Sequence, residues 1–438
     1  MFETWRNAFK QPELRKKILY TLLILLIFRI GSYITVPFLD PAALQTMFST
    51  GTGSGDFLSY LNIMTGGALS NATVFAMSIT PYINASIIIQ LLTVAIPALE
   101  RLQKEGSEGH KKIQKITRYV TLGLALIQAT AFYFLLKNSQ GNILKYKSGF
   151  SGVFAAIIII ACFTAGTALV VWLGDRISEK GLGNGISIIL FAGILSRGPA
   201  AFNMLRVWWV EMAPNNPAYY FYVPLIVIVF IAMVTFIVWM TNAERRIPVS
   251  YAKRVVGRKM YGGQNTHIPI KVNMSGVMPI IFAMSFVSLP NMIATFLGPN
   301  VKPDGFWANF FEVFRSDHWF YGLVYFLLII AFNYFYVAIQ YNPIEMANNL
   351  RKNNGAIPGI RPGKPTSDFI SRVISKVTLL GALFLGLIAV FPIIFSMITK
   401  ANVSLGGTSI LIVVGVALET MRQLESQMMM RHHKGFLE

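Results

Sequence analysis

The sequence contains the uncharged stretch AYYFYVPLIVIVFIAMVTFIVWM at residues 218–240. A helix needs about 20 consecutive apolar residues to cross the hydrocarbon core of a bilayer, so this stretch predicts a transmembrane helix. The rest of the chain has the same character, because 54% of its residues are hydrophobic, only 13% are charged, and the mean hydropathy is +0.55. These values are typical of an integral membrane protein.

Nine further stretches have the length and composition of transmembrane helices. With residues 218–240 they predict ten spans, at residues 18–36, 74–97, 116–136, 152–173, 185–205, 218–240, 274–297, 319–340, 373–396 and 405–424. The predicted fold class is therefore an all-α membrane protein with ten transmembrane helices. Because ten is an even number, both termini are expected on the same side of the membrane. The isoleucines of residues 157–160, in the fourth span, are expected to face lipid.

Basic side chains are distributed unevenly between the two sides of the membrane. The formal net charge is +19, and 29 of the 38 Lys and Arg residues lie on the side that holds the termini, whereas 8 lie on the opposite side. Basic residues accumulate in cytoplasmic loops, so both termini are expected in the cytoplasm. The positive charge also favours contact with anionic phospholipid or another acidic partner.

The outer connection at residues 211–217 divides the ten spans into five and five. An odd number of spans in each half inverts the second half relative to the first, as in membrane proteins that open a central path by moving two halves. We therefore expect two inverted, pseudo-symmetric five-helix halves, residues 1–210 and 218–438, around a central pore.

Residues 37–71 interrupt the series of spans. This outer loop contains a short apolar helix candidate, Phe57 to Met64, which is followed by Gly66 and Gly67. The candidate helix is too short to cross the bilayer. It either lies in the outer interface or forms a re-entrant segment that dips into a cavity, because outer loops of this length are usually functional.

Ionisable side chains are almost absent from the predicted spans. Arg29 is one exception, and we expect it to pair with backbone carbonyls or with a neighbouring helix. A small-solute transporter normally carries ionisable residues at mid-membrane depth. The spans contain amides instead, such as Gln90 and Asn273, which typically form hydrogen bonds between helices. This pattern favours helices that part and close again, and a small-solute permease is the alternative.

Two cytoplasmic loops, at residues 241–272 and 345–372, are rich in Lys, Arg, Gly and Pro. The first contains the charged pairs Lys253-Arg254 and Arg258-Lys259, and the second contains Arg361. Such basic loops are explained either by membrane topology with attraction to anionic headgroups, or by a docking surface for a large acidic partner. Gly and Pro residues that punctuate possible hairpins favour the docking surface.

The sequence lacks the motifs of enzymes. It has no Walker A lysine, no His-Glu-x-x-His and no Gly-x-Ser-x-Gly. The glycine-rich run Gly181 to Gly185 lies between two spans and predicts a tight cytoplasmic turn, and the five histidines and the lone Cys162 form no metal constellation. We therefore expect no catalytic residue, metal or cofactor, and the energy for transport has to come from a partner or a gradient.

Seven motifs in order along the chain resemble those of the SecY family of protein-conducting channels. They are Phe28 to Gly31, Gly66 to Ser70, Pro81 to Thr93, Gly183 to Ser187, Pro269 to Asn273, Gly359 to Gly363, and Gly406 to Ser409. The resemblance covers essentially the whole chain. It implies a passive channel in the bacterial plasma membrane that translocates unfolded secretory polypeptides and releases membrane proteins laterally into the bilayer.

The resemblance also implies roles for individual residues. An aliphatic pore ring is implied at Ile79, Ile83, Ile189, Ile281 and Ile412. A plug is implied at residues 57–72, with Phe57, Leu58, Tyr60, Leu61, Met64, Gly66 and Gly67. The resemblance further implies that spans two, three, seven and eight form a lateral gate, with Gln90 and Asn273 at its polar positions.

The implied partners are large. The loops that hold Lys253, Arg254, Arg258, Lys259 and Arg361 resemble the docking site that the ATPase SecA and the ribosome share. Signal peptides and nascent polypeptides would pass through the channel, and the small membrane proteins SecE and SecG would accompany it. Lys364 departs from the acidic residue that is frequent in the family at this position, which leaves the detail of docking open.

Overall fold

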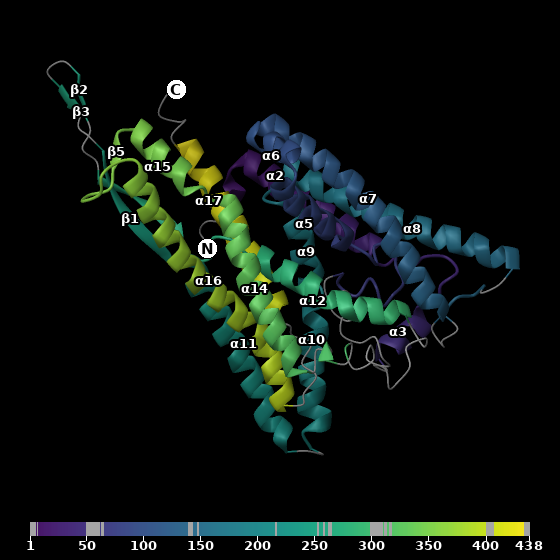
Figure 1. Ribbon diagram of the computed structural model, residues 1–438. Coiled ribbons are helices and arrows are strands. Elements are labelled where there is room, and N and C mark those ends of the chain that lie inside the picture. Colours follow the sequence, from purple (N-terminus) through teal and green to yellow (C-terminus); the bar gives the residue numbers. More distant parts are fainter. Residues whose placement is uncertain are drawn as a thin grey trace. The chain divides into compact units, whose positions relative to one another are not determined.

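The computed structural model of the chain describes residues 6–432 apart from residue 7 and the segments 50–61, 63–64, 139–142, 147–148, 215–216, 252–253, 257–258, 262–264, 298–309, 311–312, 315–317 and 400–406. The fold is mostly helical, and each of the ten predicted spans coincides with one helix or with a pair of helices (Figure 1). In chain order these are α2 (Pro12–Gly31), α5 (Thr80–Ala95), α7 (Ser107–Asn138), α8 (Gly149–Lys180), α9 (Gly185–Leu195) with α10 (Gly198–Val207), α11 (Ala218–Asn242), α12 (Met278–Leu297), α14 (Trp319–Gln340), α16 (Lys364–Thr399) and α17 (Gly407–His432).

Several of these helices are long and apolar enough to cross a membrane. Among the described residues, six segments meet this condition, and a seventh does if α5 and the following α6 (Pro97–Lys104) count as one span. α5 and α6 are bent by 105° relative to each other. The chain is therefore a multi-pass membrane protein.

Several helices, such as α7, α8 and α16, extend beyond the predicted span limits, and in two other spans the backbone shows the cause of the difference. α5 begins at Thr80, whereas the predicted span begins at residue 74, because the preceding residues form turns in which Ala72 and Ser78 have φ angles of 49° and 45°. Pro81 suits the first turn of α5, where its missing N–H is not needed. The span at residues 185–205 is divided into α9 and α10, with Pro199 in the first turn of α10, and it continues into a π-helical turn, Trp208–Met212.

The contacts between residues group the chain into two units. The first unit comprises Met1–Val223, Ser288–His318 and Ile412–Glu438, and the second comprises Pro224–Val287 and Trp319–Leu411. The division into two five-helix halves at residues 211–217 stays a prediction.

In the first unit, α5 packs on α7, α7 on α8, and α8 on α9. Phe132 of α7 and Phe163 of α8 meet edge to face, with ring centroids 5.6 Å apart, in a core of buried apolar side chains. Leu44 of the short helix α3 (Pro41–Ser49) is fully buried in the same core. The part of the loop between α2 and α5 that forms α3 is therefore packed against α7 and α8.

The glycine-rich run after α8 forms the predicted turn. Gly183 has a φ of +74°, and the Asn184 side chain accepts a hydrogen bond from the backbone N–H of Ile186, which caps α9. Leu182 is buried in a cluster with Leu14 of α2 and Leu424 of α17. This turn thus holds the first and last helices of the first unit together.

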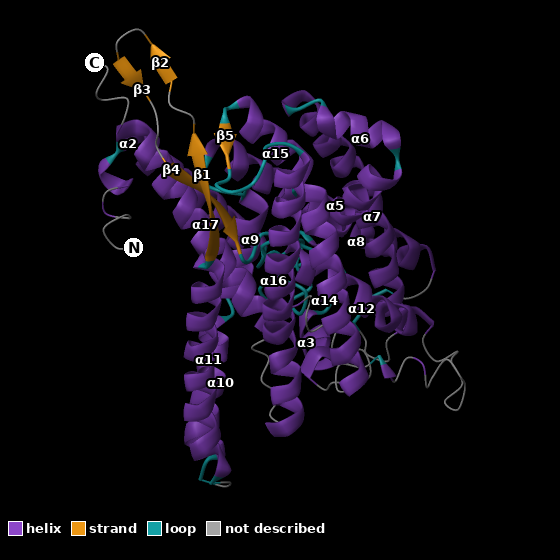
Figure 2. Cartoon of the chain, turned by 60° about the vertical axis from the view of Figure 1, so that its left-hand side comes forward, coloured by secondary structure: helices purple, strands orange, loops and turns teal. Residues whose placement is uncertain are grey.

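In the second unit, the two loops predicted to dock a partner form one β-sheet with the strand order β4-β1-β5 (Figure 2). β1 (Glu244–Tyr251) pairs antiparallel with β4 (Asn265–Lys271) along its length, and its end pairs with β5 (Gly355–Ala356). Buried side chains fasten this sheet to α14, α15 (Pro343–Lys352) and α16. They are Ile247, Val249, Ile270, Val337, Leu350, Ile357, Ile370, Ile374 and Val377.

Candidate functional site

Four of the five predicted ring isoleucines are buried within the chain. Ile79, Ile189, Ile281 and Ile412 have exposed fractions between 0% and 6%, and Ile83 is partly buried. These four side chains therefore do not face lipid. Ile281 belongs to the second unit and the other ring residues to the first, so the ring itself stays a prediction.

The isoleucine run in α8 faces two ways, which corrects the expectation that it faces lipid throughout. Ile157 is 62% exposed, whereas Ile159 is fully buried in the core of the first unit. Successive residues of a helix are rotated by about 100°, so positions i and i+2 lie on nearly opposite faces. Ile157 is therefore the lipid-facing residue of this pair.

The predicted plug segment is described only in its last part. Phe57, Leu58, Tyr60, Leu61 and Met64 lie outside the described residues, and so does the choice between an interfacial and a re-entrant helix.

The described end of the plug segment is a glycine turn. Gly66 and Gly67 have φ angles of +67° and +88°, which residues other than glycine rarely adopt. Asn62 holds the turn, because its backbone carbonyl accepts from the N–H of Gly67 (2.8 Å) and its side chain accepts from the N–H of Ser70 (3.0 Å).

Arg29 connects three segments of the first unit. Its guanidinium group donates to the Ser196 hydroxyl at the end of α9 (3.2 Å), to the carbonyl of Gly66 (3.5 Å) and to the Tyr33 hydroxyl (3.3 Å). It also lies over the Tyr33 ring, 5.1 Å from the centroid. The expectation that Arg29 pairs with backbone carbonyls or a neighbouring helix is confirmed. The end of the plug segment is thereby fixed to α2 and α9.

The two predicted gate amides share an unusual property. The Oε1 atom of Gln90 in α5 and the Oδ1 atom of Asn273, which follows β4, are buried and accept no hydrogen bond from the described residues. A buried polar atom without a partner destabilises a protein by about 1–3 kcal/mol. Each side chain therefore has an amide oxygen that can accept a hydrogen bond from a new donor.

The described docking residues lie in the two loops that the sheet of the second unit connects. Arg254 is in β2 (Arg254–Val256) and Lys259 is in β3 (Lys259–Tyr261), which pair as a short hairpin, whereas Lys253 and Arg258 lie outside the described residues. Arg361 is exposed just before α16, and its backbone carbonyl accepts from the Thr366 hydroxyl (2.8 Å). The sheet thus joins the two loops into one surface, which the sequence did not predict.

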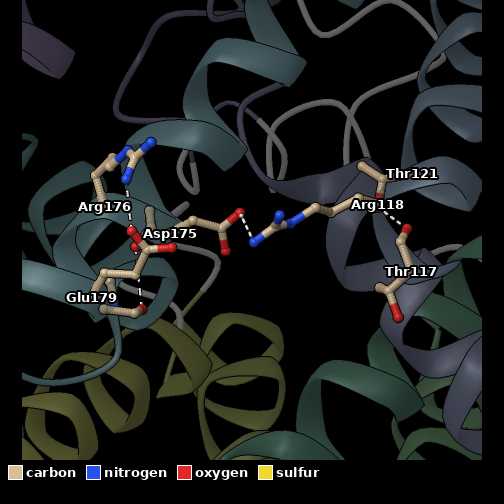
Figure 3. A network of polar contacts seen from close by, with 9 residues as sticks. Thr117, Arg118, Thr121, Asp175, Arg176 and Glu179 are labelled. Atoms are coloured by element: carbon tan, nitrogen blue, oxygen red, sulfur yellow. Dashed lines mark hydrogen bonds and ion pairs between the residues drawn. The ribbon is translucent and has the colours of Figure 1, made fainter. Parts of the chain in front are cut away.

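The structure contains an ion pair between α7 and α8 that the sequence analysis did not predict. An Nη atom of Arg118 lies 2.8 Å from a carboxylate oxygen of Asp175, and Arg176 pairs with Glu179 nearby (Figure 3). Both partners are partly exposed, so the ion pair adds at most about 1 kcal/mol. The sequence places several charged residues near the ends of both predicted spans, which does not identify the partner of Arg118.

Comparison with known proteins finds relatives over the whole chain. The family described as SecY matches residues 73–421. A protein of Streptomyces galbus named "Protein translocase subunit SecY" is 41% identical over 449 residues, which cover all of both chains.

Solved structures show the same fold. The structure of a SecY protein whose plug domain is described as stabilising the closed state of the translocation channel has a TM-score of 0.65 at 18% identity, over 94% of this chain and 92% of that one. The canine Sec61 channel in its complex with the ribosome has a TM-score of 0.57 at 16% identity, with the same coverage.

Proposed function

The chain belongs to the SecY family, and we propose that it forms the pore through which a translocase moves unfolded polypeptides across the bacterial plasma membrane. The observation that carries this conclusion is the match at 41% identity along the full length of a translocase subunit. The protein is a passive channel and not an enzyme. ATP hydrolysis by SecA, or synthesis by the ribosome, supplies the driving force.

In this proposal, the five isoleucines Ile79, Ile83, Ile189, Ile281 and Ile412 form the constriction. Isoleucine offers no group that replaces the hydration shell of an ion, and a ring of such side chains closes a pore by excluding water. The burial of four of the five side chains within the chain supports this role. The plug segment covers the same pore from outside, and Arg29 fixes its described end through the carbonyl of Gly66.

A signal sequence opens the channel sideways, between the gate helices. Each CH₂ group that moves from water into lipid contributes about 0.8 kcal/mol, so one apolar helix supplies enough free energy to shift a gate that is poised within a few kcal/mol. The unbonded amide oxygens of Gln90 and Asn273 favour this role, because a buried oxygen without a donor is unfavourable and gains a hydrogen bond from an arriving chain or from water.

The sheet of the second unit is the docking surface for the driving partner. Its strands β1 and β5 join the loops that contain Arg254, Lys259 and Arg361, and guanidinium groups suit bidentate contact with carboxylate or with RNA phosphate. The ribosome-bound state of canine Sec61 supports the ribosome as one such partner. SecA is the other, and SecE and SecG accompany the pore. Anionic phospholipid binds the remaining basic residues, and both termini face the cytoplasm.

The function is tested by reconstituting the chain with SecE and SecG into sealed vesicles and adding SecA, ATP and an unfolded precursor. The precursor should become protected from protease, and it should stimulate ATP hydrolysis by SecA only when the chain is present. Vesicles that contain SecE and SecG alone are the control. Accumulation of a small solute without precursor protection would instead identify a permease.

A further inference from the structure

The segment between β4 and α12 packs closely against α16, because residue 381 of α16 is a glycine and has no side chain. The residues from Val272 to Val277 form no regular element, and Gly276 within them has a φ of +65°. The carbonyl oxygen of Val272 approaches Gly381 of α16 so closely that a Cβ at Gly381 would overlap with it. Only glycine leaves room for this approach, so residue 381 fixes the point where the chain leaves the docking sheet.

A buried amide attaches the same segment to α14. The Ser275 hydroxyl donates to Oδ1 of Asn333, and Nδ2 of Asn333 donates to the backbone carbonyl of Thr378 in α16 (3.0 Å). Ser275 and Asn333 are only 4% and 2% exposed. The amide oxygen and nitrogen of Asn333 therefore connect α14 both to the segment before α12 and to α16.

Aromatic contacts continue this attachment along α12. Phe282 is fully buried, and its ring centroid lies 5.9 Å from that of Phe332 and 6.3 Å from that of Tyr336, both in α14. We call the contacts of Val272, Ser275 and Phe282 with α14 and α16 the α12 seat. Asn273, the predicted gate amide, lies between two of these fixed residues in the chain.

We propose that Asn333 is a positioning residue that holds α12 and Asn273 in the seat, and that a signal sequence has to displace α12 from this seat when it opens the channel. The inference rests on the proposed function, because it assumes that α12 is a gate helix. It adds an energetic contribution from a residue outside the predicted pore ring, plug and gate amides. Moving α12 away from α14 separates the Ser275 hydroxyl from Asn333 and leaves a buried amide oxygen without a donor.

The test removes the hydroxyl with Ser275→Ala. Export of a reporter with a defective signal sequence is measured relative to the same reporter with an intact signal. The loss of one buried neutral hydrogen bond should raise this ratio about fivefold, which corresponds to about 1 kcal/mol. Thr235→Val removes a hydroxyl that donates to the carbonyl of Ile231 in its own helix, α11 (2.9 Å), and it is the matched control.

Two further variants separate positioning from folding. Ser275→Thr keeps the hydroxyl donor and should restore the wild-type ratio, whereas Asn333→Leu removes both hydrogen bonds and should raise the ratio at least as much as Ser275→Ala. An unchanged ratio in Ser275→Ala, an equal rise in Thr235→Val, or failure of Ser275→Ala to accumulate in the membrane would each overturn the inference. A wild-type chain that exports neither reporter would contradict the proposed function itself, so the two failures are distinguishable.

Discussion

The glycine turn at the end of the plug segment can be tested with two neighbouring substitutions, Gly66→Ala and Gly67→Ala. Both glycines have a positive φ, so an alanine at either position adopts a left-handed conformation that is about 1–2 kcal/mol unfavourable. The surroundings differ. A Cβ at Gly66 would lie 2.6 Å from the Ser196 hydroxyl oxygen and 2.8 Å from the carbonyl oxygen of Gly193, whereas a Cβ at Gly67 would have no atom of the described residues within 4 Å.

At Gly66 the close contact should therefore destabilise the protein in addition to the unfavourable backbone conformation of the alanine. The carbonyl of Gly193 belongs to the backbone of α9 and moves little, so overpacking adds about 1–3 kcal/mol. Gly66→Ala should destabilise the protein by about 2–5 kcal/mol, against about 1–2 kcal/mol for Gly67→Ala. The lower entropy of alanine in the unfolded chain affects both variants equally and cancels in the comparison.

The assay is the thermal unfolding midpoint of the purified chain in detergent, followed by circular dichroism, together with the passive ion conductance of the reconstituted channel. Gly66→Ala should have the lower midpoint and the higher conductance. Ser196→Ala combined with Gly66→Ala should recover part of the midpoint, relative to Ser196→Ala alone, because one of the two close contacts disappears. A midpoint for Gly67→Ala that is equal to or lower than that of Gly66→Ala would refute the reasoning.

Three further predictions concern the pore, the docking surface and the orientation. Ile412→Asn should raise ion conductance and the export of a reporter with a defective signal, because an amide holds water in a dry ring. Ile157→Asn, on a residue that is 62% exposed, should change neither quantity. If Ile412→Asn also leaves both quantities unchanged, Ile412 does not belong to the ring. Arg361→Glu should accumulate normally and abolish the stimulation of SecA, whereas Arg351→Glu, at the end of α15, should have a weaker effect; poor accumulation of Arg361→Glu would indicate a structural role. An impermeant thiol reagent outside intact cells should label Lys145→Cys and leave Arg351→Cys unlabelled, and the opposite pattern would invert the topology.

The expectations that held depend on local properties of the sequence. Hydropathy over about 20 residues located ten helical segments, because a transmembrane helix satisfies its own backbone hydrogen bonds and needs an apolar surface. The expectation for Arg29 also held, since a guanidinium group in a span needs acceptors wherever they are. The expectation for residues 157–160 failed at Ile159, because a uniformly apolar run does not distinguish the lipid-facing side from the core side of a helix.

By itself, the sequence determined the membrane character of the chain, the order of its helical segments, its family and the type of residue at each implied site. Only the tertiary structure decided which of these segments meet. It joined the two basic loops through Ser250 and Ala356, paired Arg118 with Asp175, and placed Ser275 on Asn333. Composition does not encode such pairs, because each partner is an ordinary residue in its own segment. Their contact arises from the packing of helices that lie far apart in the chain.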